Sequence, residues 1–363
     1  MRTGCGLRTV VKILEVFSEV LGKNFGKSPC YNTVENWIKK LGLSVYQDDQ
    51  PCKGKKFAMV MDESIAINGQ KLLLALAIPS EHQDRPVKHE DVTVLNMTVG
   101  ANFKGEDIEN KISEVTISAG SEPQYVISDN AHNLVRGILD SGYVHYADIS
   151  HSMGVILKKV YEKQPDFYTL QSIALLIWGN SMLACYNKLP KEMQEAYAFI
   201  NDYESLLQEL MDALDAIRHI EHICKNKGFS CKTSKECQSY IVAHVIGNAY
   251  PRQAHLGLKM LEYFRKEEAQ LTEDMNICIS SDIIESTFGI YKSKKSPNKL
   301  YGITPFALMI PLYPKVVNES VTKTFNFKER LVNVKLKDID AWTTEHLSKN
   351  WVTERTKTLK QVS

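Results

Sequence analysis

The chain has 363 residues, enough for two or three domains, and its 44 lysines and arginines nearly balance its 43 aspartates and glutamates. The resulting net charge of +1 excludes a polycation and weighs mildly against a nucleic-acid binder with a basic face over the whole chain. No apolar run reaches the roughly 20 residues that span a bilayer, and the eight cysteines are scattered, so we expect a cytoplasmic protein with reduced thiols.

Residues 1–50 contain two helical patterns separated by a polar turn. Asn32 or Thr33 is the expected cap of the second helix, and Lys39 and Lys40 lie on its polar face. Its apolar face consists of Val34, Trp37, Ile38 and Leu41. This pattern is typical of a helix-turn-helix, with both lysines as candidate DNA contacts. The alternative is a helical hairpin that packs on the next domain.

Residues 57–78 predict a β-hairpin around Asn68-Gly69, because two apolar, strand-like runs flank this turn signal. Asp62 lies inside the first run. Burying an unpaired carboxylate costs roughly several kcal/mol. We therefore expect Asp62 either to have a cation beside it or to lie at an open edge of the sheet.

The elements after the hairpin alternate between strands and helices. We expect strands over residues 91–100, 124–129 and 143–148, helices over 105–119 and 130–139, and a long helix from about residue 150. The order of hairpin, strand, helix, strand, helix, strand and helix is that of a ribonuclease H-like arrangement.

Asp129 ends the fourth predicted strand. In such a sheet the first and fourth strands are neighbours about 4.8 Å apart, so Asp62 and Asp129 can share one cation. Ligands of open α/β sheets also gather at the carboxyl ends of strands. Taken alone, Asp129 would be read as the cap of the next helix. Together with Asp62 and the strand order, it favours a metal site.

Only helical periods appear between about residues 153 and 276, which predicts a helical block of more than a hundred residues. The histidines and cysteines in it match no compact zinc-ligand spacing and favour a helix surface with core cysteines. These residues are His219, His222, Cys224, Cys231 and Cys237.

A further helix is expected after Ser280 or Ser281, either of which can cap it. Asp282 and Glu285 share one of its faces, and a basic run that includes Lys292 follows. Acids followed by lysines suit a site that holds metal and contacts phosphate, although a solvated charged face is the common alternative. Beyond it we expect an apolar helix over 302–312 that packs on the sheet, then polar, irregular chain from about residue 320 with one helix over 338–349.

These features together resemble the DDE transposases of the retroviral-integrase (ribonuclease H-like) superfamily. The resemblance is carried by Asp62, by Ser128-Asp129-Asn130 and by Glu285-Ser286-Thr287-Phe288-Gly289. Asp148-Ile149-Ser150-His151 is similar to the Cys/Asp-x-x-His motif of several such groups. The long gap between Asp129 and Glu285 is similar to the position of an all-helical insertion domain in these enzymes.

The resemblance implies an α/β, ribonuclease H-like mixed five-stranded sheet with a large all-α insertion and an N-terminal helix-turn-helix. The implied domains are a DNA-binding region over 1–50, a first catalytic part over 55–160, the insertion over 161–278, a second catalytic part with the third acid over 279–320, and a tail over 321–363. The implied activity is cleavage of transposon ends and strand transfer into target DNA.

By the same resemblance, Asp62, Asp129 and Glu285 would hold two Mg²⁺ or Mn²⁺ ions. His151, helped by Asp148, would orient or protonate a DNA oxygen. Trp178 would stack on a flipped base, although a core tryptophan is the more ordinary interpretation. The candidate DNA contacts are Lys39, Lys40, Lys292, Lys294, Lys295, Lys299 and Trp178.

Some alternatives remain open at this stage. Glu63 adjoins Asp62 and Asp282 shares a face with Glu285, so either could be a ligand, and Asp148 could be the third carboxylate of a structure-selective nuclease. A non-catalytic, DNA-binding transposase relic is the other rival. The expected partners are double-stranded DNA (transposon ends and target) and further copies of the chain, without a membrane. The protein would be nucleoid-associated in a prokaryote and nuclear in a eukaryote.

Overall fold

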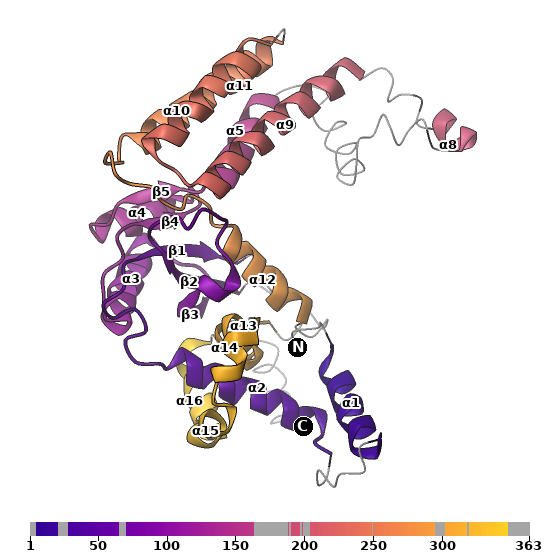
Figure 1. Cartoon of the computed structure of the whole chain (residues 1–363), viewed down its shortest axis with the longest axis vertical. Helices are drawn as coiled ribbons and strands as arrows, with labels where there is room; N and C mark the ends of the chain where they lie inside the picture. Colours follow the sequence, from indigo (N-terminus) through magenta and orange to yellow (C-terminus); the bar gives the residue numbers. More distant parts are fainter. Residues whose placement is uncertain are drawn as a thin grey trace, which may run out of the picture. The chain divides into compact units, whose positions relative to one another are not determined.

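The computed structural model describes residues 5–20, 28–64, 70–162, 188, 190–196, 198, 204–248, 250–294, 302–317 and 319–347. The chain divides into two compact units (Figure 1). The first unit consists of Met1–Tyr146 and Ser280–Ser363, and the second of Ala147–Ile279. None of the helices in these described ranges has the length and apolar character needed to cross a membrane.

A five-stranded mixed sheet lies in the first unit, with its strands in the order β3-β2-β1-β4-β5. The strands are β1 (Phe57–Glu63), β2 (Lys71–Pro79), β3 (Thr93–Gly100), β4 (Val126–Ser128) and β5 (His145–Ala147). β2 is antiparallel to both β1 and β3, whereas β4 runs parallel to β1. The predicted α/β class, the mixed five-stranded sheet and the predicted order of elements are confirmed. The expected Asn68-Gly69 turn lies outside the described residues.

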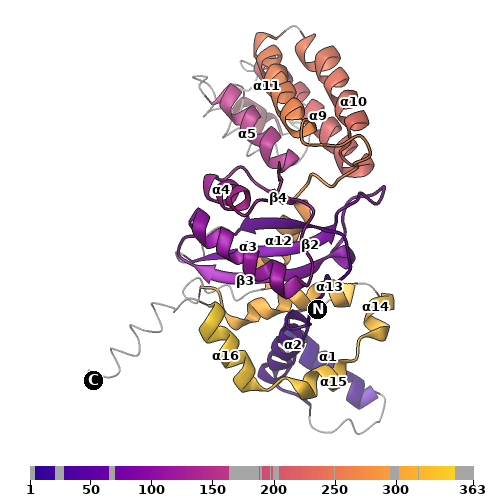
Figure 2. The ribbon, with the colours of Figure 1, turned by 90° about the vertical axis from the view of Figure 1, so that its left-hand side faces the viewer.

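Helices α3 (Gly105–Ala119) and α4 (His132–Asp140) pack on one face of the sheet, and α3 lies in front of the strands in Figure 2. Alternate residues of β1, Met59 and Met61, enter a core with the apolar faces of both helices. Side chains of a strand alternate between its two faces. Asp62 therefore faces away from α3 and α4, and this orientation decides what it can contact.

The two ends of the chain together form a helical layer in the first unit. Its central helix, α2 (Tyr31–Tyr46), lies among helices from the C-terminal segment (Figure 2). These are η5 (Pro305–Leu308), α13 (Met309–Val317), α15 (Phe327–Asn333) and α16 (Leu336–His346). A Cβ at Gly42 would lie 1.7 Å from the Leu308 carbonyl oxygen, so this close packing requires glycine. Part of the expected DNA-binding helix is thus the core of this layer.

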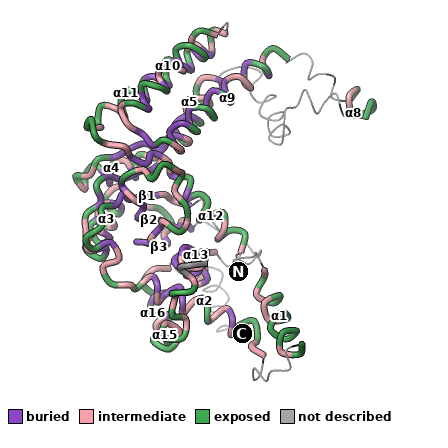
Figure 3. Tube along the Cα trace, in the orientation of Figure 1, coloured by how far each residue is buried: buried purple, intermediate pink, exposed green. Residues whose placement is uncertain are grey.

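The two helices predicted within residues 1–50 are confirmed, but details of both differ. No residue of α1 (Leu7–Val20) is buried, as Figure 3 also shows. The caps expected at Asn32 or Thr33 are wrong, because α2 begins at Tyr31 and the Cys30 carbonyl accepts its first backbone hydrogen bonds. Trp37, expected on the buried face, is 40% exposed.

The expectation of irregular chain from about residue 320 is wrong. α14 (Glu319–Thr324) and α15 precede α16, which corresponds to the helix predicted over 338–349. Arg330 of α15 pairs with Asp48, at 2.9 and 3.2 Å, and donates to the Ser44 carbonyl oxygen. These partners are almost 300 positions away in the sequence, so the local pattern gave no sign of what stabilises these short helices.

The secondary structure described in the second unit is helical, apart from Ala147 at the end of β5 and one isolated bridge between Phe229 and Ile277. Its helices are α5 (Ile149–Tyr161), α8 (Lys191–Ala196), α9 (Glu204–Lys227), α10 (Cys231–Tyr240), the π-helix η3 (Ile241–Ile246) and α11 (Pro251–Glu268). The helical run expected near residues 170–186 lies outside the described part. The predicted helical block is otherwise confirmed, and this unit begins at Ala147.

A buried carboxylate joins three helices of the second unit. Glu209 of α9 is 1% exposed and accepts from Arg252 of α11, at 2.6 and 3.1 Å, and from the Tyr161 hydroxyl of α5, at 3.0 Å. Removing one partner of such a buried pair leaves the other charge without compensation. The network therefore fixes how α5, α9 and α11 pack.

Glu209→Gln is expected to lower the free energy of unfolding by about 2 kcal/mol, because the amide keeps the shape but loses the charge that Arg252 pairs with. Denaturant unfolding, followed by circular dichroism, measures this loss. Glu262→Gln is the matched control, since its pair with Lys259 is exposed and worth about 0–1 kcal/mol. Equal stability losses in both variants would contradict the role of the buried network.

Candidate catalytic site

The register of two neighbouring strands brings Asp62 and Asp129 opposite each other. Met59 pairs with Val126 and Val60 with Ile127 in the parallel ladder between β1 and β4. Extending this register by two residues places Asp62 beside Asp129, on strands about 4.8 Å apart. The predicted proximity of these two carboxylates, which depended on the strand order, is therefore present.

Asp62 is partly buried on the sheet face opposite α3 and α4. Its Oδ1 accepts a hydrogen bond from the Glu63 backbone amide at 2.7 Å. Burial raises the pKa of Asp62 to about 7, and the negative charges of Asp129, Glu285 and Glu63 act in the same direction. The Glu63 amide opposes this shift by stabilising the ionised form. The charges of both other acids of the predicted triad thus act on Asp62.

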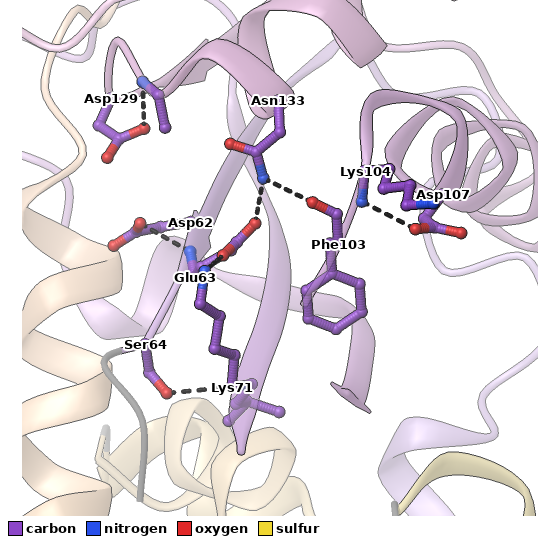
Figure 4. Close-up of polar contacts among 11 residues, drawn as sticks. Asp62, Glu63, Ser64, Lys71, Phe103, Lys104, Asp107, Asp129 and Asn133 are labelled. Atoms are coloured by element: carbon purple, nitrogen blue, oxygen red, sulfur yellow. Dashed lines mark hydrogen bonds and ion pairs between the residues drawn. The ribbon is translucent and has the colours of Figure 1, made fainter. Parts of the chain in front are cut away.

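Asp129 follows β4 directly and lies in the turn before α4. Its Oδ1 accepts from the Ala131 backbone amide at 3.0 Å, whereas the N-cap position of α4 is Ala131 itself. Asp129 therefore stabilises the turn without occupying the cap position that the alternative interpretation gave it. Figure 4 shows the Asp62 and Asp129 carboxylates on the same side of β1.

Glu285 comes from α12 (Asp282–Lys294), which packs against β1. Ser281 precedes the helix, and its carbonyl oxygen accepts from Ile284 N at 2.8 Å. Ile284, Phe288 and Tyr291 form part of the buried face of α12. Glu285 is exposed, and its negative charge raises the pKa of Asp62. This effect groups Glu285 with the two strand acids, Asp62 and Asp129.

Asp282, the alternative to Glu285, lines a different hollow. A cavity of about 400 Å³ lies between α12 and the segment around His89, with Asp282 and Ser286 among its lining residues. Asp282 is not among the charges that raise the pKa of Asp62. Of these two acids of α12, Glu285 is therefore the one whose charge acts on Asp62.

Glu63, the other alternative ligand, is held by partners on the opposite face of β1. Lys71 Nζ of β2 donates to Glu63 Oε2 at 2.6 Å, and the Asn133 side-chain amide of α4 donates to Glu63 Oε1 (Figure 4). Asn133 also donates to the Phe103 carbonyl oxygen at 3.0 Å. This network fixes the end of β1. Asp62 is then the acid of β1 on the face that α12 packs against.

The three acids match a divalent cation in the kind of atom that they offer. Carboxylate oxygens suit Mg²⁺, and a cation would offset both the burial and the neighbouring negative charges that raise the pKa of Asp62. Within the described ranges, however, no three histidine, cysteine, aspartate or glutamate side chains lie close enough to hold a metal ion together. Holding one at Asp62, Asp129 and Glu285 would require these side chains to approach each other.

The Asp-x-x-His motif has a local structural explanation. Asp148 is 2% exposed and caps α5 by accepting from the His151 backbone amide at 2.6 Å, while the His151 side chain is exposed. Both residues belong to the second unit, whereas Asp62, Asp129 and Glu285 belong to the first. The motif is therefore a helix start, and its spacing follows from the capping bond.

The four predicted DNA contacts that the structure describes lie on two separate helices, α2 and α12. Lys39 pairs with Glu35 at 2.6 Å, and Lys40 donates to the Leu331 carbonyl oxygen at 3.0 Å, so both already have partners within the helical layer. Lys292 and Lys294 lie in the last turn of α12 beyond Glu285. The remaining candidates, Lys295, Lys299 and Trp178, lie outside the described residues.

Two histidines near the acids were missed by sequence reasoning. His145 Nε2 lies 2.9 Å from the Ser128 hydroxyl, which donates to the Asp129 carbonyl oxygen at 2.8 Å. His89 Nε2 lies 3.0 Å from Ser286 Oγ, one residue after Glu285. The first contact joins β5 to the end of β4, and the second joins the segment around His89 to α12. Neither contact has a local sequence pattern that could have revealed it.

Neither the family models searched nor the curated proteins compared match this chain.

Proposed function

We propose that the chain is a metal-dependent DNA transposase of the DDE type, with a ribonuclease H-like catalytic domain interrupted by the helical unit. The observation that carries this proposal is that the charges of Asp129 and Glu285 act on Asp62. The three acids come from β1, the end of β4 and α12. Three acids with a purely structural role would oppose folding here, because the charges of Asp129 and Glu285 disfavour the ionisation of Asp62.

The sheet topology supports the same proposal. The strand order β3-β2-β1-β4-β5, with a parallel β1–β4 pair beside an antiparallel hairpin, is the arrangement expected of a ribonuclease H-like sheet. The two sheet acids lie at the carboxyl ends of β1 and β4, where open α/β sheets place their ligands. The third acid enters from a helix beyond the insertion.

Each group has a role in the proposed mechanism. Asp62, Asp129 and Glu285 would hold Mg²⁺ or Mn²⁺, which supplies activation of the attacking oxygen and stabilisation of the leaving one. The Glu63–Lys71 pair fixes the end of β1 and so the direction of Asp62. Lys292 and Lys294, following Glu285, would contact DNA phosphates and position the strand for in-line attack.

A non-catalytic DNA-binding relic is the second candidate. It is favoured by the absence, among the residues described, of any three potential ligands gathered closely enough for a metal ion. A structure-selective nuclease, the third interpretation, would use the same acids to cut DNA without joining it.

The deciding experiment uses the full chain with DNA that carries the ends of its element, in Mg²⁺, Mn²⁺ or no divalent cation. Cation-dependent cleavage with joining to target DNA is expected of a transposase. Cleavage without joining would support the nuclease. Tight, salt-sensitive binding without cleavage in either cation would overturn the catalytic proposal and support the relic.

A further inference from the structure

A polar cavity in the helical layer of the first unit is separate from the three acids. It has a volume of about 610 Å³, within the 300–1,000 Å³ common for small-ligand sites. α2, α13 and α15 contribute to its lining, together with Thr324 of α14. Residues more than 250 positions apart thus meet around one hollow that the catalytic proposal does not use.

Lys315, on α13, is half-buried and lines this cavity. Burial lowers the pKa of Lys315, and the positive charges of Lys55 and Arg330 act in the same direction, against Asp48. No hydrogen bond or ion pair joins the Lys315 ammonium to any residue of the described segments. A lysine taken from water without a hydrogen-bond partner is costly unless something else supplies one.

The acids of the lining form no ion pair with Lys315. Asp48 is engaged by both guanidinium nitrogens of Arg330, at 2.9 and 3.2 Å. Glu329 accepts from the Asn326 side-chain amide at 2.8 Å and is exposed. Lys315 is therefore a cation of the cavity that has no hydrogen-bond or ion-pair partner among the described residues.

Two residues with amide donors line the same hollow. They are Gln47 and Asn333, whose side-chain amides form no hydrogen bond within the described part of the chain. An ammonium and two amides provide several N–H donors around one space. A group with several anionic acceptor oxygens can accept from all three and also balance the charge of the ammonium, which a neutral ligand cannot.

We propose that this cavity binds a phosphate group, with Lys315 as its charged partner and Gln47 and Asn333 as neutral donors. Phosphate offers more acceptor oxygens than a carboxylate, and charge-assisted bonds to it are roughly twice as strong as neutral ones. The phosphate can belong to a DNA strand or be free in solution. Assigning it to DNA rests on the proposed function, whereas the phosphate site itself does not.

The test compares the full-length wild type with Lys315→Met and Lys328→Met. Lys328 is an exposed lysine of α15 outside the cavity lining, so its variant controls for the loss of one positive charge. Calorimetric titration with inorganic phosphate and fluorescence anisotropy with a short DNA duplex are run at one fixed salt concentration. Lys315→Met is expected to weaken binding by about tenfold or more, and Lys328→Met by much less.

The outcomes separate the two sources of phosphate. Weakened binding of both probes supports a site that accepts free phosphate, and weakened binding of DNA alone supports a site for phosphate within a strand. Unchanged binding of both probes by Lys315→Met overturns the proposal. Asn333→Ala, at an exposed position, provides a second variant, and its effect should have the same direction but be smaller.

Folding and catalysis are controlled separately. Lys315→Met replaces a half-buried cation by an apolar side chain of similar length, so its melting temperature should equal or exceed that of wild type. A wild type that binds phosphate through Lys315 but cleaves no DNA would refute the catalytic proposal and leave the phosphate site intact. If wild type cleaves DNA but Lys315→Met leaves phosphate binding unchanged, the phosphate site is refuted and the catalytic proposal stands.

Discussion

Glu285→Gln is expected to lose metal-dependent DNA cleavage by about 10³-fold or more, while Asp282→Asn keeps it. A bound cation contributes several kcal/mol of transition-state charge stabilisation, and each 1.36 kcal/mol corresponds to a factor of ten in rate. Glu285 contributes to the charge around Asp62, whereas Asp282 lines the cavity near His89. Single-turnover cleavage of a labelled DNA end measures both rates.

The two variants are a matched pair because both residues are exposed acids in the first turn of α12. Each substitution removes one negative charge and keeps the shape of the side chain, so DNA binding should change similarly in both. A loss in Asp282→Asn with activity retained in Glu285→Gln would move the third ligand by one helical turn. Activity retained in both would remove α12 from the catalytic site.

Local sequence patterns predicted the elements that depend on local chemistry. The helix over 105–119 has its predicted bounds, because Gly120, with φ of 75°, provides the left-handed conformation that ends it. The strands of the hairpin follow from their apolar runs, and Asp62 is conspicuous as an acid inside one of them. The approach of Asp62 to Asp129 followed from these elements once the strand order was assumed.

Features that depend on contacts distant in sequence could not be predicted. The alternation of β1 separates Asp62 from Glu63, but only the positions of α3, α4 and α12 reveal which face has the site. Likewise, the cavity around Lys315 exists because α13 and α15 pack on α2. Neither segment contains a pattern that identifies its partner.

The structure also changes the interpretation of the N-terminal helices. Val34, Ile38 and Leu41 of α2 are buried against the C-terminal helices, so its apolar face is used in the folding of the first unit. The exposed helix of this pair is α1, which has no buried residue. If this region contacts DNA, α2 supports the surface from within rather than lying free in a groove.

The protonation of Asp62 is expected to make the stability of the protein depend on pH. Its pKa of about 7 exceeds the unfolded value near 4, so the folded state binds the proton more tightly. The resulting stabilisation is fully present below about pH 4 and is lost as pH rises through 7. Its size is roughly 2–4 kcal/mol, at 1.36 kcal/mol per pKa unit, with some reduction because Asp62 is only partly buried.

Asp62→Asn should remove this dependence, because the amide does not ionise. Without divalent cations, the variant is expected to match wild type near pH 4 and to exceed its unfolding free energy by roughly 2–4 kcal/mol at pH 8. Urea unfolding at a series of pH values measures the difference between the two proteins. Taking this difference cancels the contributions of other titrating groups.

Glu63→Gln is the matched control, since it changes the adjacent acid on the opposite face of β1. It loses the ion pair with Lys71 and is expected to destabilise the protein instead. Adding Mg²⁺ at pH 8 should stabilise wild type and have little effect on Asp62→Asn, because a cation that binds only the folded state stabilises it by mass action. If Asp62→Asn is no more stable than wild type at pH 8, burial and the charges of the other acids raise the pKa of Asp62 too little for the three acids to require a cation. That result would remove the physical reason for placing a metal ion between them.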